Sequence, residues 1–171
     1  DLVEQFLAKR QPIVKVTNIM KQAQFEQLDV VSFASQTRAF IKIQEGCNNF
    51  CTFCIIPKLR GKLRSRSVES LVNEAKNLAS TGVRELNLIS QDLSDYGVDL
   101  DENNNLANLL TGLEQVEGID WLRLFYFYPD ELTDEVIEKM ATSEKICKYL
   151  DMPVQHFPTN VLKRMNRKIT G

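Results

Sequence analysis

Three of the chain's four cysteines lie within eight residues, and this crowding is the strongest chemical signal in the sequence. They are Cys47, Cys51 and Cys54, whereas the fourth, Cys147, lies far downstream. Three thiolates in one short loop can each bind one iron of a [4Fe–4S] cluster. The fourth iron then stays open to a substrate or cofactor, so the spacing predicts an open iron–sulfur cluster.

Two other uses of the thiols remain open at this point. A zinc site could be completed by Cys147 or by His156, the only histidine, or the thiols could be inert and buried. Structural zinc sites more often carry two pairs of closely spaced ligands, which this sequence lacks. The odd number of clustered thiols therefore favours the cluster over zinc.

The composition limits the classes of protein that need to be considered. The chain has 171 residues, of which 43% are apolar, which is enough for the core of one domain or of a piece of a larger one. A net charge of −2 gives no overall attraction to nucleic acid. No apolar stretch is long enough to span a membrane and no signal-peptide pattern opens the chain. These features predict a cytoplasmic protein without a membrane partner, in a compartment where thiols stay reduced.

From residue 38 onward, strand and helix patterns alternate. Strands are predicted at 39–44, 83–90, 121–127 and 147–155. Helices are predicted after Ser67, near residue 106, and after Thr133 and Thr159, with stops at Gly82 and Gly118. This order predicts parallel strands joined by right-handed crossovers. About four βα units cannot close a barrel of eight, so we expect an α/β fold with an incomplete parallel barrel.

The residues before 38 have a weaker pattern. Residues 2–7 have helical spacing, 13–19 could form a short strand, and 20–37 read as a connection. In open and closed parallel folds, functional groups gather at the carboxyl ends of the strands. Those ends are predicted at 44–54, 90–96, 126–130 and 153–156, and the first of them contains the three clustered cysteines.

The cysteine motif resembles a known family. "GCNNFCTFC" (46–54) is similar to the CxxxCxxC loop of radical S-adenosylmethionine (SAM) enzymes. The longer run "EGCNNFCTFCIIPKLRG" (45–61) resembles the methylthiotransferase branch, whose pattern includes Pro57 and the pair Arg60-Gly61. The resemblance continues to Gly171 and implies a radical SAM partial (β/α) barrel.

The resemblance also implies roles for individual residues. Cys47, Cys51 and Cys54 would bind the cluster, whose open iron would bind the amine and carboxylate of SAM and cleave it to a 5′-deoxyadenosyl radical. The expected SAM contacts are Phe53 at the adenine, Ser90, Gln91 and Asp92 near the amino group, Gln155 at the ribose, and Arg123 at the carboxylate. A capped turn at 90–92 and a surface salt bridge for Arg123 are the structural alternatives.

Four further runs resemble one branch of the methylthiotransferases. They are "YGVD" (96–99), "YFYP" (126–129), "YLDMPVQH" (149–156) and "LKRMNR" (162–167). This branch adds a methylthio group to the β-carbon of an aspartate in a small-subunit ribosomal protein, free or on the ribosome. The alternatives are the branch acting on an adenosine of tRNA, and a non-catalytic metal-binding module. A lone histidine such as His156 is more often structural than a general base.

The family's three-part build bears on the domain prediction. Residues 1–37 are expected to be a linker and the tail of a missing N-terminal domain, which would hold a second [4Fe–4S] cluster. Residues 38–171 are expected to form the barrel, truncated before its last strands. An electron donor is a further implied partner.

Two other groups of residues carry weaker predictions. The basic run from Lys58 to Arg66 is either a solvated face or a contact for an acidic partner or RNA. Of the four aromatic residues at 125–128, two are expected in the core. Cys147 is expected to pack at the start of the fourth strand.

Overall fold

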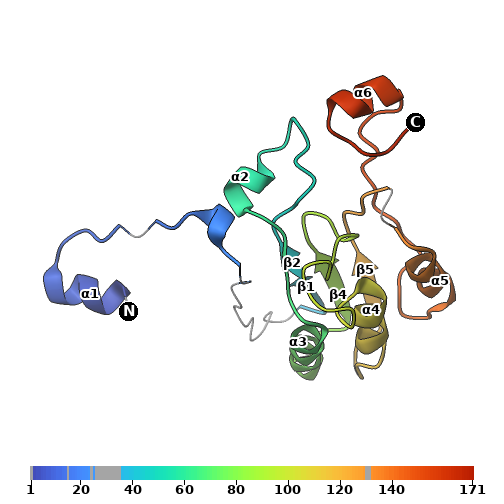
Figure 1. The fold of residues 1–171 in the computed structure, drawn as a ribbon. Coiled ribbons are helices and arrows are strands. Elements are labelled where there is room, and N and C mark those ends of the chain that lie inside the picture. Colours follow the sequence, from blue (N-terminus) through green and yellow to red (C-terminus); the bar gives the residue numbers. More distant parts are fainter. Residues whose placement is uncertain (1, 15, 24, 26–35, 130–131) are drawn as a thin grey trace.

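The computed structural model describes residues 2–14, 16–23, 25, 36–129 and 132–171, and its centre is a parallel sheet (Figure 1). The three strands are β1 (Arg38–Lys42), β4 (Glu85–Ile89) and β5 (Trp121–Leu124), in the order β1-β4-β5. The main helices that follow them are α3 (Val68–Ser80), α4 (Leu106–Glu114) and α5 (Asp134–Thr142). The predicted α/β class with a partial parallel sheet is therefore confirmed.

One face of this sheet builds the core. The strands are in register so that Ala39, Leu86 and Leu122 form one row. Ile41, Leu88 and Leu124 form the next row, and all six side chains are buried against the helices. The opposite face carries Arg38, Phe40, Glu85, Asn87, Trp121 and Arg123. Alternate residues of a strand point to opposite faces, so the sequence period of two accounts for this division.

Three helices begin at side-chain caps. Ser67 accepts from the N–H of Ser70 at 3.3 Å, and Thr133 accepts from the N–H of Val136 at 3.4 Å, as predicted. Asn105, which was not predicted as a cap, accepts from the N–H of Asn108 at 2.9 Å. Each cap pairs one N–H that the helix itself cannot bond. The prediction that α4 runs to Gly118 is wrong, because the helix ends at Glu114.

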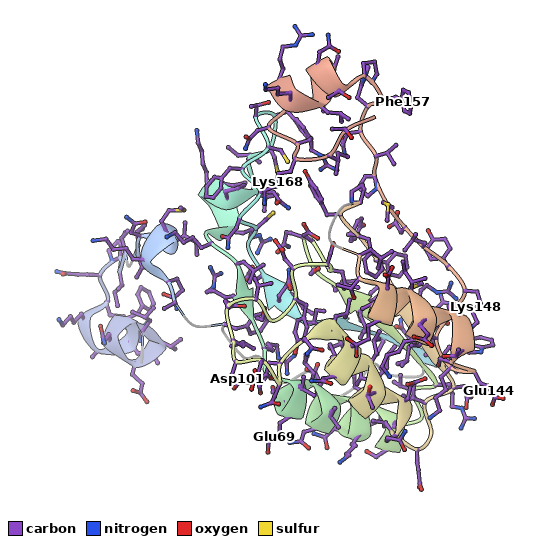
Figure 2. The ribbon with its side chains drawn as sticks, turned by 45° about the vertical axis from the view of Figure 1, so that its right-hand side comes forward. Glu69, Asp101, Glu144, Lys148, Phe157 and Lys168 are labelled. Carbon is purple, nitrogen blue, oxygen red and sulfur yellow. The ribbon has the colours of Figure 1, made fainter. Side chains whose placement is uncertain are left out.

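The predicted fourth strand at 147–155 does not form. Beside β5 there is only an isolated bridge between Leu122 and Ile146. The N–H of Tyr149 is bonded within its own segment, to the carbonyl of Cys147 at 2.7 Å, so it cannot extend the ladder. Lys148 donates instead to carbonyls at the end of α5 (Figure 2). In the described residues the parallel sheet has three strands, which corrects the expectation of about four βα units.

Two other predicted strands are shorter than expected. The strand expected at 121–127 ends at Leu124, because the backbone turns into the left-handed region at Tyr126 (φ 67°). The strand expected at 39–44 divides into β1 and β2 (Gln44–Glu45). β2 pairs antiparallel with β3 (Arg64–Ser65), which the sequence pattern did not predict. This small pair encloses the cysteine loop, which we define as residues 46–55 and which leads into α2 (Ile56–Arg60).

The two ends of the chain lie apart from the sheet (Figure 1). The predicted helix near the N-terminus is α1 (Leu2–Lys9), which has no buried residue, and η1 (Ile19–Lys21) lies beside α2. The described residues of 13–19 do not form a strand, and most of 26–37 lies outside the described residues, as does Asp130.

α6 (Thr159–Arg164) is preceded by Pro158 and has no side-chain cap, so the expected cap by Thr159 is wrong. The domain boundary near residue 38 stays a prediction.

None of the helices in the described ranges combines the length and apolarity required to cross a membrane.

The backbone at Gly46 limits which residue can begin the cysteine loop. Gly46 has φ 82°, and a Cβ there would lie 2.1 Å from the carbonyl oxygen of Lys62. We expect Gly46→Ala to lower the free energy of unfolding by about 3 kcal/mol, of which roughly 1–2 is backbone strain and the rest is displacement of β3.

Gly82→Ala is the matched control for this prediction. Gly82 has φ 97°, and no atom lies within 4 Å of a Cβ built there. Gly82→Ala should therefore lose only the free energy that corresponds to backbone strain. Denaturant unfolding of both variants measures the difference, and equal losses would contradict the role of close approach at Gly46.

The sheet face opposite the core, which we call the open sheet face, carries ion pairs that predict a pH-dependent free energy of unfolding. Burial tends to raise the pKa of Glu85, but hydrogen bonds from Arg123 (2.8 Å) and Arg38 (3.0 Å) and their charges outweigh it, so this pKa is lowered. The stabilisation is therefore present above the ordinary carboxyl pKa and is lost as the pH falls through the lowered value.

Glu85→Gln should therefore lower the free energy of unfolding at pH 7 by about 2 kcal/mol, with the loss shrinking towards acid pH. In the matched variant Asp120→Asn, the exposed pair of Asp120 with Arg84 is broken, and the cost should stay below about 1 kcal/mol. Denaturant titrations at several pH values test both, and a Glu85→Gln loss that does not change with pH would refute the assignment.

Candidate functional site

The three clustered cysteines line one pocket with residues from distant parts of the chain. The pocket has a volume of about 160 Å³ and lies at the carboxyl ends of β4 and β5. All the cysteines are free thiols, and those of the loop are half-buried. The lining residues are Cys47, Asn49, Cys51, Phe53, Cys54, Gln91, Asp92, Tyr126, Phe127, Tyr128, Pro153, Gln155 and Arg167.

The cysteine loop is bonded to the end of β4. The side-chain amide of Asn49 donates to the carboxylate of Asp92 at 2.6 Å. The N–H of Gly46 donates to the side-chain oxygen of Gln91 at 2.8 Å. A third bond comes from β2, the strand before the loop, where the side-chain amide of Gln44 donates to the carbonyl of Asp92. These bonds place the first cysteine beside the second predicted strand end.

The same loop is bonded to the segment after α6. The N–H of Thr52 donates to the carbonyl of Met165 at 3.1 Å. The side-chain amide of Asn166 donates to the carbonyls of Asn49 and Phe50, each at 3.1 Å. Phe50 and Asn166 are both in the left-handed region, at φ 48° and 57°. The loop is therefore held from two sides by segments far apart in the sequence.

The pocket disfavours negative charge on an isolated thiol. The pKa of Cys47 is raised to about 11, mainly by burial and also by the charges of Asp92 and Asp95. The hydrogen bond from the N–H of Asn49 lowers this pKa but does not outweigh the other causes. Burial also raises the pKa of Asp92, against hydrogen bonds from Ser94 and Asn49. A thiol in this position becomes a thiolate readily only when a cation such as iron binds it.

Four of the predicted SAM contacts line this pocket, and two lie outside it. Phe53, Gln91, Asp92 and Gln155 line it. Ser90 is buried beside them, and its hydroxyl has no hydrogen-bond partner among the described residues. Arg123 is bonded to Glu85 at 2.8 Å and lies 5.8 Å from the ring centre of Tyr149, on the open sheet face. The structure thus gives Arg123 the salt-bridge arrangement that the sequence left as its alternative.

Neither candidate for a fourth zinc ligand lies at this pocket. The N–H of Cys147 donates to Leu122 at the other end of β5, as expected for packing at the start of that segment. His156 is exposed and lines a neighbouring cavity of about 720 Å³ between residues 153–157 and the C-terminal segment. Among the side chains that the structure describes, no three His, Cys, Asp or Glu residues are placed so that they could bind the same single metal ion.

Two of the five cations in the predicted basic run are buried and three are exposed. Arg64 and Arg66 are buried, and Arg66 pairs with the buried Glu74. Arg60 is exposed but pairs with Glu45 at 2.9 Å. Lys58 and Lys62 remain exposed. Both readings of the run, as a solvated face or as a partner contact, are therefore wrong for Arg64 and Arg66, whose charges hold the β2–β3 pair and α3 in place.

Six lining residues were missed as site residues by sequence reasoning, although each lies within a run quoted for its family resemblance. They are Asn49, Tyr126, Phe127, Tyr128, Pro153 and Arg167. Of the aromatic residues at 125–128, Phe127 and Tyr128 are buried, which matches the expected number in the core. The contacts of Tyr128 and Arg167 arise from the tertiary fold, so the spacing of residues along the chain did not indicate them.

The donor set suits the iron–sulfur cluster predicted from the sequence. Three free thiols surround one pocket, and the buried guanidinium of Arg167 donates to the sulfur of Cys51 at 3.9 Å. The Nε of Arg167 has no hydrogen-bond partner among the described residues. A cluster held by three thiolates carries net negative charge, which a buried cation stabilises.

Comparisons with known proteins show which family the chain resembles. The chain is 58% identical over 130 residues to the ribosomal protein uS12 methylthiotransferase RimO of Clostridium novyi, covering 76% of this chain and 29% of that protein. It is 49% identical over 157 residues to the protein of the same name from Clostridium perfringens, covering 92% and 35%. The chain thus spans about a third of the length of these relatives.

Solved structures share the fold at low sequence identity. The radical SAM methyltransferase TsrM of Kitasatospora setae, with cobalamin and a [4Fe–4S] cluster bound, gives a TM-score of 0.61 at 17% identity, covering 77% of this chain and 26% of that one. The cobalamin-dependent enzyme OxsB gives 0.57, also at 17% identity, covering 77% and 20%. The family model of the Radical SAM superfamily matches residues 41–171, which is most of the chain. This chain is a member of the radical SAM superfamily.

Proposed function

We propose that this chain is the radical SAM part of a methylthiotransferase that modifies an aspartate of the small-subunit ribosomal protein uS12. The observation that carries the proposal is the pocket in which Cys47, Cys51 and Cys54 meet the ends of β4 and β5. The identity of 49–58% to relatives named as uS12 methylthiotransferases supports this substrate. The product would carry a methylthio group on the aspartate β-carbon.

The three thiols would hold three irons of a [4Fe–4S] cluster and leave one iron for SAM. Given one electron from the electron donor, a cluster held there would supply the reductive cleavage of SAM that starts radical chemistry on the substrate. A second [4Fe–4S] cluster in an N-terminal domain and an electron donor also belong to the proposal.

The protein's own residues would bind and orient the cofactor. Phe53, Gln91, Asp92 and Gln155 line the pocket beside the thiols, and Ser90 supports the end of β4. Asp92 is already fixed by Asn49 and by Ser94, whose hydroxyl donates to it at 2.7 Å. A carboxylate fixed in this way offers a preorganised partner for a cationic group such as an ammonium, without rearrangement. Arg123 is not assigned to the cofactor, because Glu85 holds it.

The charges of the described residues give no specific support to an RNA substrate. A basic surface is the usual footprint of RNA binding, and two of the five cations of the run at 58–66 are buried. The tRNA alternative therefore has no specific observation in its favour, and it serves as an outcome of the test below.

Replacing single cysteines tests the cluster. After anaerobic reconstitution with iron and sulfide, we expect the chain to bind about four irons and to absorb in the visible range. Cys47→Ser, Cys51→Ser or Cys54→Ser should each lower the bound iron severalfold. The matched control is Cys147→Ser, which should load like the unchanged chain because Cys147 lies at the other end of β5. Loss of iron in Cys147→Ser, or a colourless zinc site, would refute this ligand set.

Mass spectrometry tests the substrate. In a strain that lacks the gene for the full-length protein, uS12 should lose the mass of one methylthio group on an aspartate. Complementation with the full-length gene should restore this mass, whereas a full-length Cys51→Ser variant should not. Loss of the methylthio group from tRNA, with uS12 unchanged, would reject the proposed substrate and support the tRNA alternative.

A further inference from the structure

We propose that Arg167 is a positioning residue that orients Cys51 and raises the reduction potential of the cluster bound there. The inference rests on the proposed function, because it requires a cluster at the three cysteines. Arg167 comes from the opposite end of the chain and reaches the pocket only through the fold.

The guanidinium of Arg167 is buried and closely surrounded. Its residue is 8% exposed, although arginine is rarely buried without a pairing partner. One terminal nitrogen, Nη1, donates to Cys51 Sγ at 3.9 Å, and the other, Nη2, donates to the carbonyl of Pro153 at 3.2 Å. The guanidinium carbon lies 3.8 Å from the ring centre of Tyr128. These contacts fix the plane of the guanidinium and direct one edge at the cysteine sulfur.

Among the described residues of this pocket, the positive charge of Arg167 has no anionic partner. Its Nε has no hydrogen-bond partner in the described part of the chain, where no ion pair of Arg167 is found either. Asp92 also lines the pocket, but its carboxylate oxygens accept from Asn49 and Ser94. A buried unpaired cation is costly, so the arrangement indicates an anion that joins it. Three thiolates with their cluster provide that anion beside the guanidinium.

The segment carrying Arg167 is bonded directly to the cysteine loop. Met165 accepts from Thr52, and Asn166 donates to two loop carbonyls. The N–H of Arg167 itself donates to the carbonyl of Leu162 at 2.9 Å, which fixes the segment to α6. Figure 2 shows α6 at the top of the molecule, with Phe157 pointing outward beside it. Because loop and segment are bonded together, the distance from the guanidinium to Cys51 is set by the fold.

A fixed cation near a cluster sulfur has a defined physical effect. One-electron reduction adds negative charge to the cluster, and a nearby cation or N–H donor stabilises that added charge. The guanidinium therefore favours the reduced state and raises the reduction potential. Its contact from Nη1 also restrains the Cys51 sulfur.

The test is the midpoint potential of the cluster in the reconstituted chain without SAM. Arg167→Met should lower the ratio of reduced to oxidised cluster at a fixed potential about tenfold, which corresponds to about 59 mV for a one-electron couple. Arg167→Lys keeps the charge but not the planar fork, so we expect a smaller shift in the same direction. Arg164→Met is the matched control, because the exposed side chain of Arg164 does not line the pocket.

Each outcome decides between the proposals. Far-ultraviolet circular dichroism and iron content establish that each variant is folded and loaded. The electron paramagnetic resonance spectrum of the cluster should change more in Arg167→Met than in Arg167→Lys.

An unchanged potential in a loaded Arg167 variant would overturn the inference and leave the proposed function intact. A shift that appears only after SAM is added would overturn it too, since Arg167 would then bind SAM. If Arg167→Met fails to load, an unshifted Arg167→Lys overturns the inference. Failure of the unchanged chain to bind a cluster would overturn both proposals.

Discussion

The hydrogen bond between Asn49 and Asp92 is the contact on which the arrangement of the site depends. A loop of ten residues that carries three thiols has little apolar surface to hold it, and Phe50, Phe53 and Ile55 are exposed. Polar bonds to the end of β4 take the place of a core here. Because both partners are buried, loss of either would leave one buried polar atom of the other without this bond, namely Oδ2 of Asp92 or Nδ2 of Asn49.

The electrostatics of the pocket link this contact to the chemistry. Burial raises the pKa of Cys47, and the charge of the Asp92 carboxylate that holds the loop adds to this effect. Binding of iron reverses the balance, because metal binding releases the thiol proton and adds positive charge. The buried guanidinium of Arg167 lies on the Cys51 side of the same pocket. The site thus combines an anion that anchors the loop with a cation that faces the ligands, and a charged cofactor fits between them.

Local features of the site and fold were predictable from the sequence, whereas contacts between distant segments were not. The caps at Ser67 and Thr133 and the presence of the first three strands depend on neighbouring residues, and these predictions are confirmed, whereas cluster binding by the three cysteines stays a prediction. The segment 147–155 has the composition of a strand, but the contacts of Lys148 with α5 and the bond of Tyr149 within its own segment prevent pairing. The arginines of the basic run have partners in β2 and α3 that no charge count indicates.

Arg167 shows why the rest of the site required the fold. It lies 116 residues from Cys51, and its side chain becomes significant only where Tyr128 and Pro153 meet the cysteine loop. Closing so long a chain segment costs conformational entropy, which the core of the intervening βα units offsets. The loop near the beginning of the family match at 41–171 and the segment near its end line one pocket and are hydrogen-bonded to each other. The βα units that lie between them in the sequence therefore bring a cation from the segment after α6 to a thiol that follows β2.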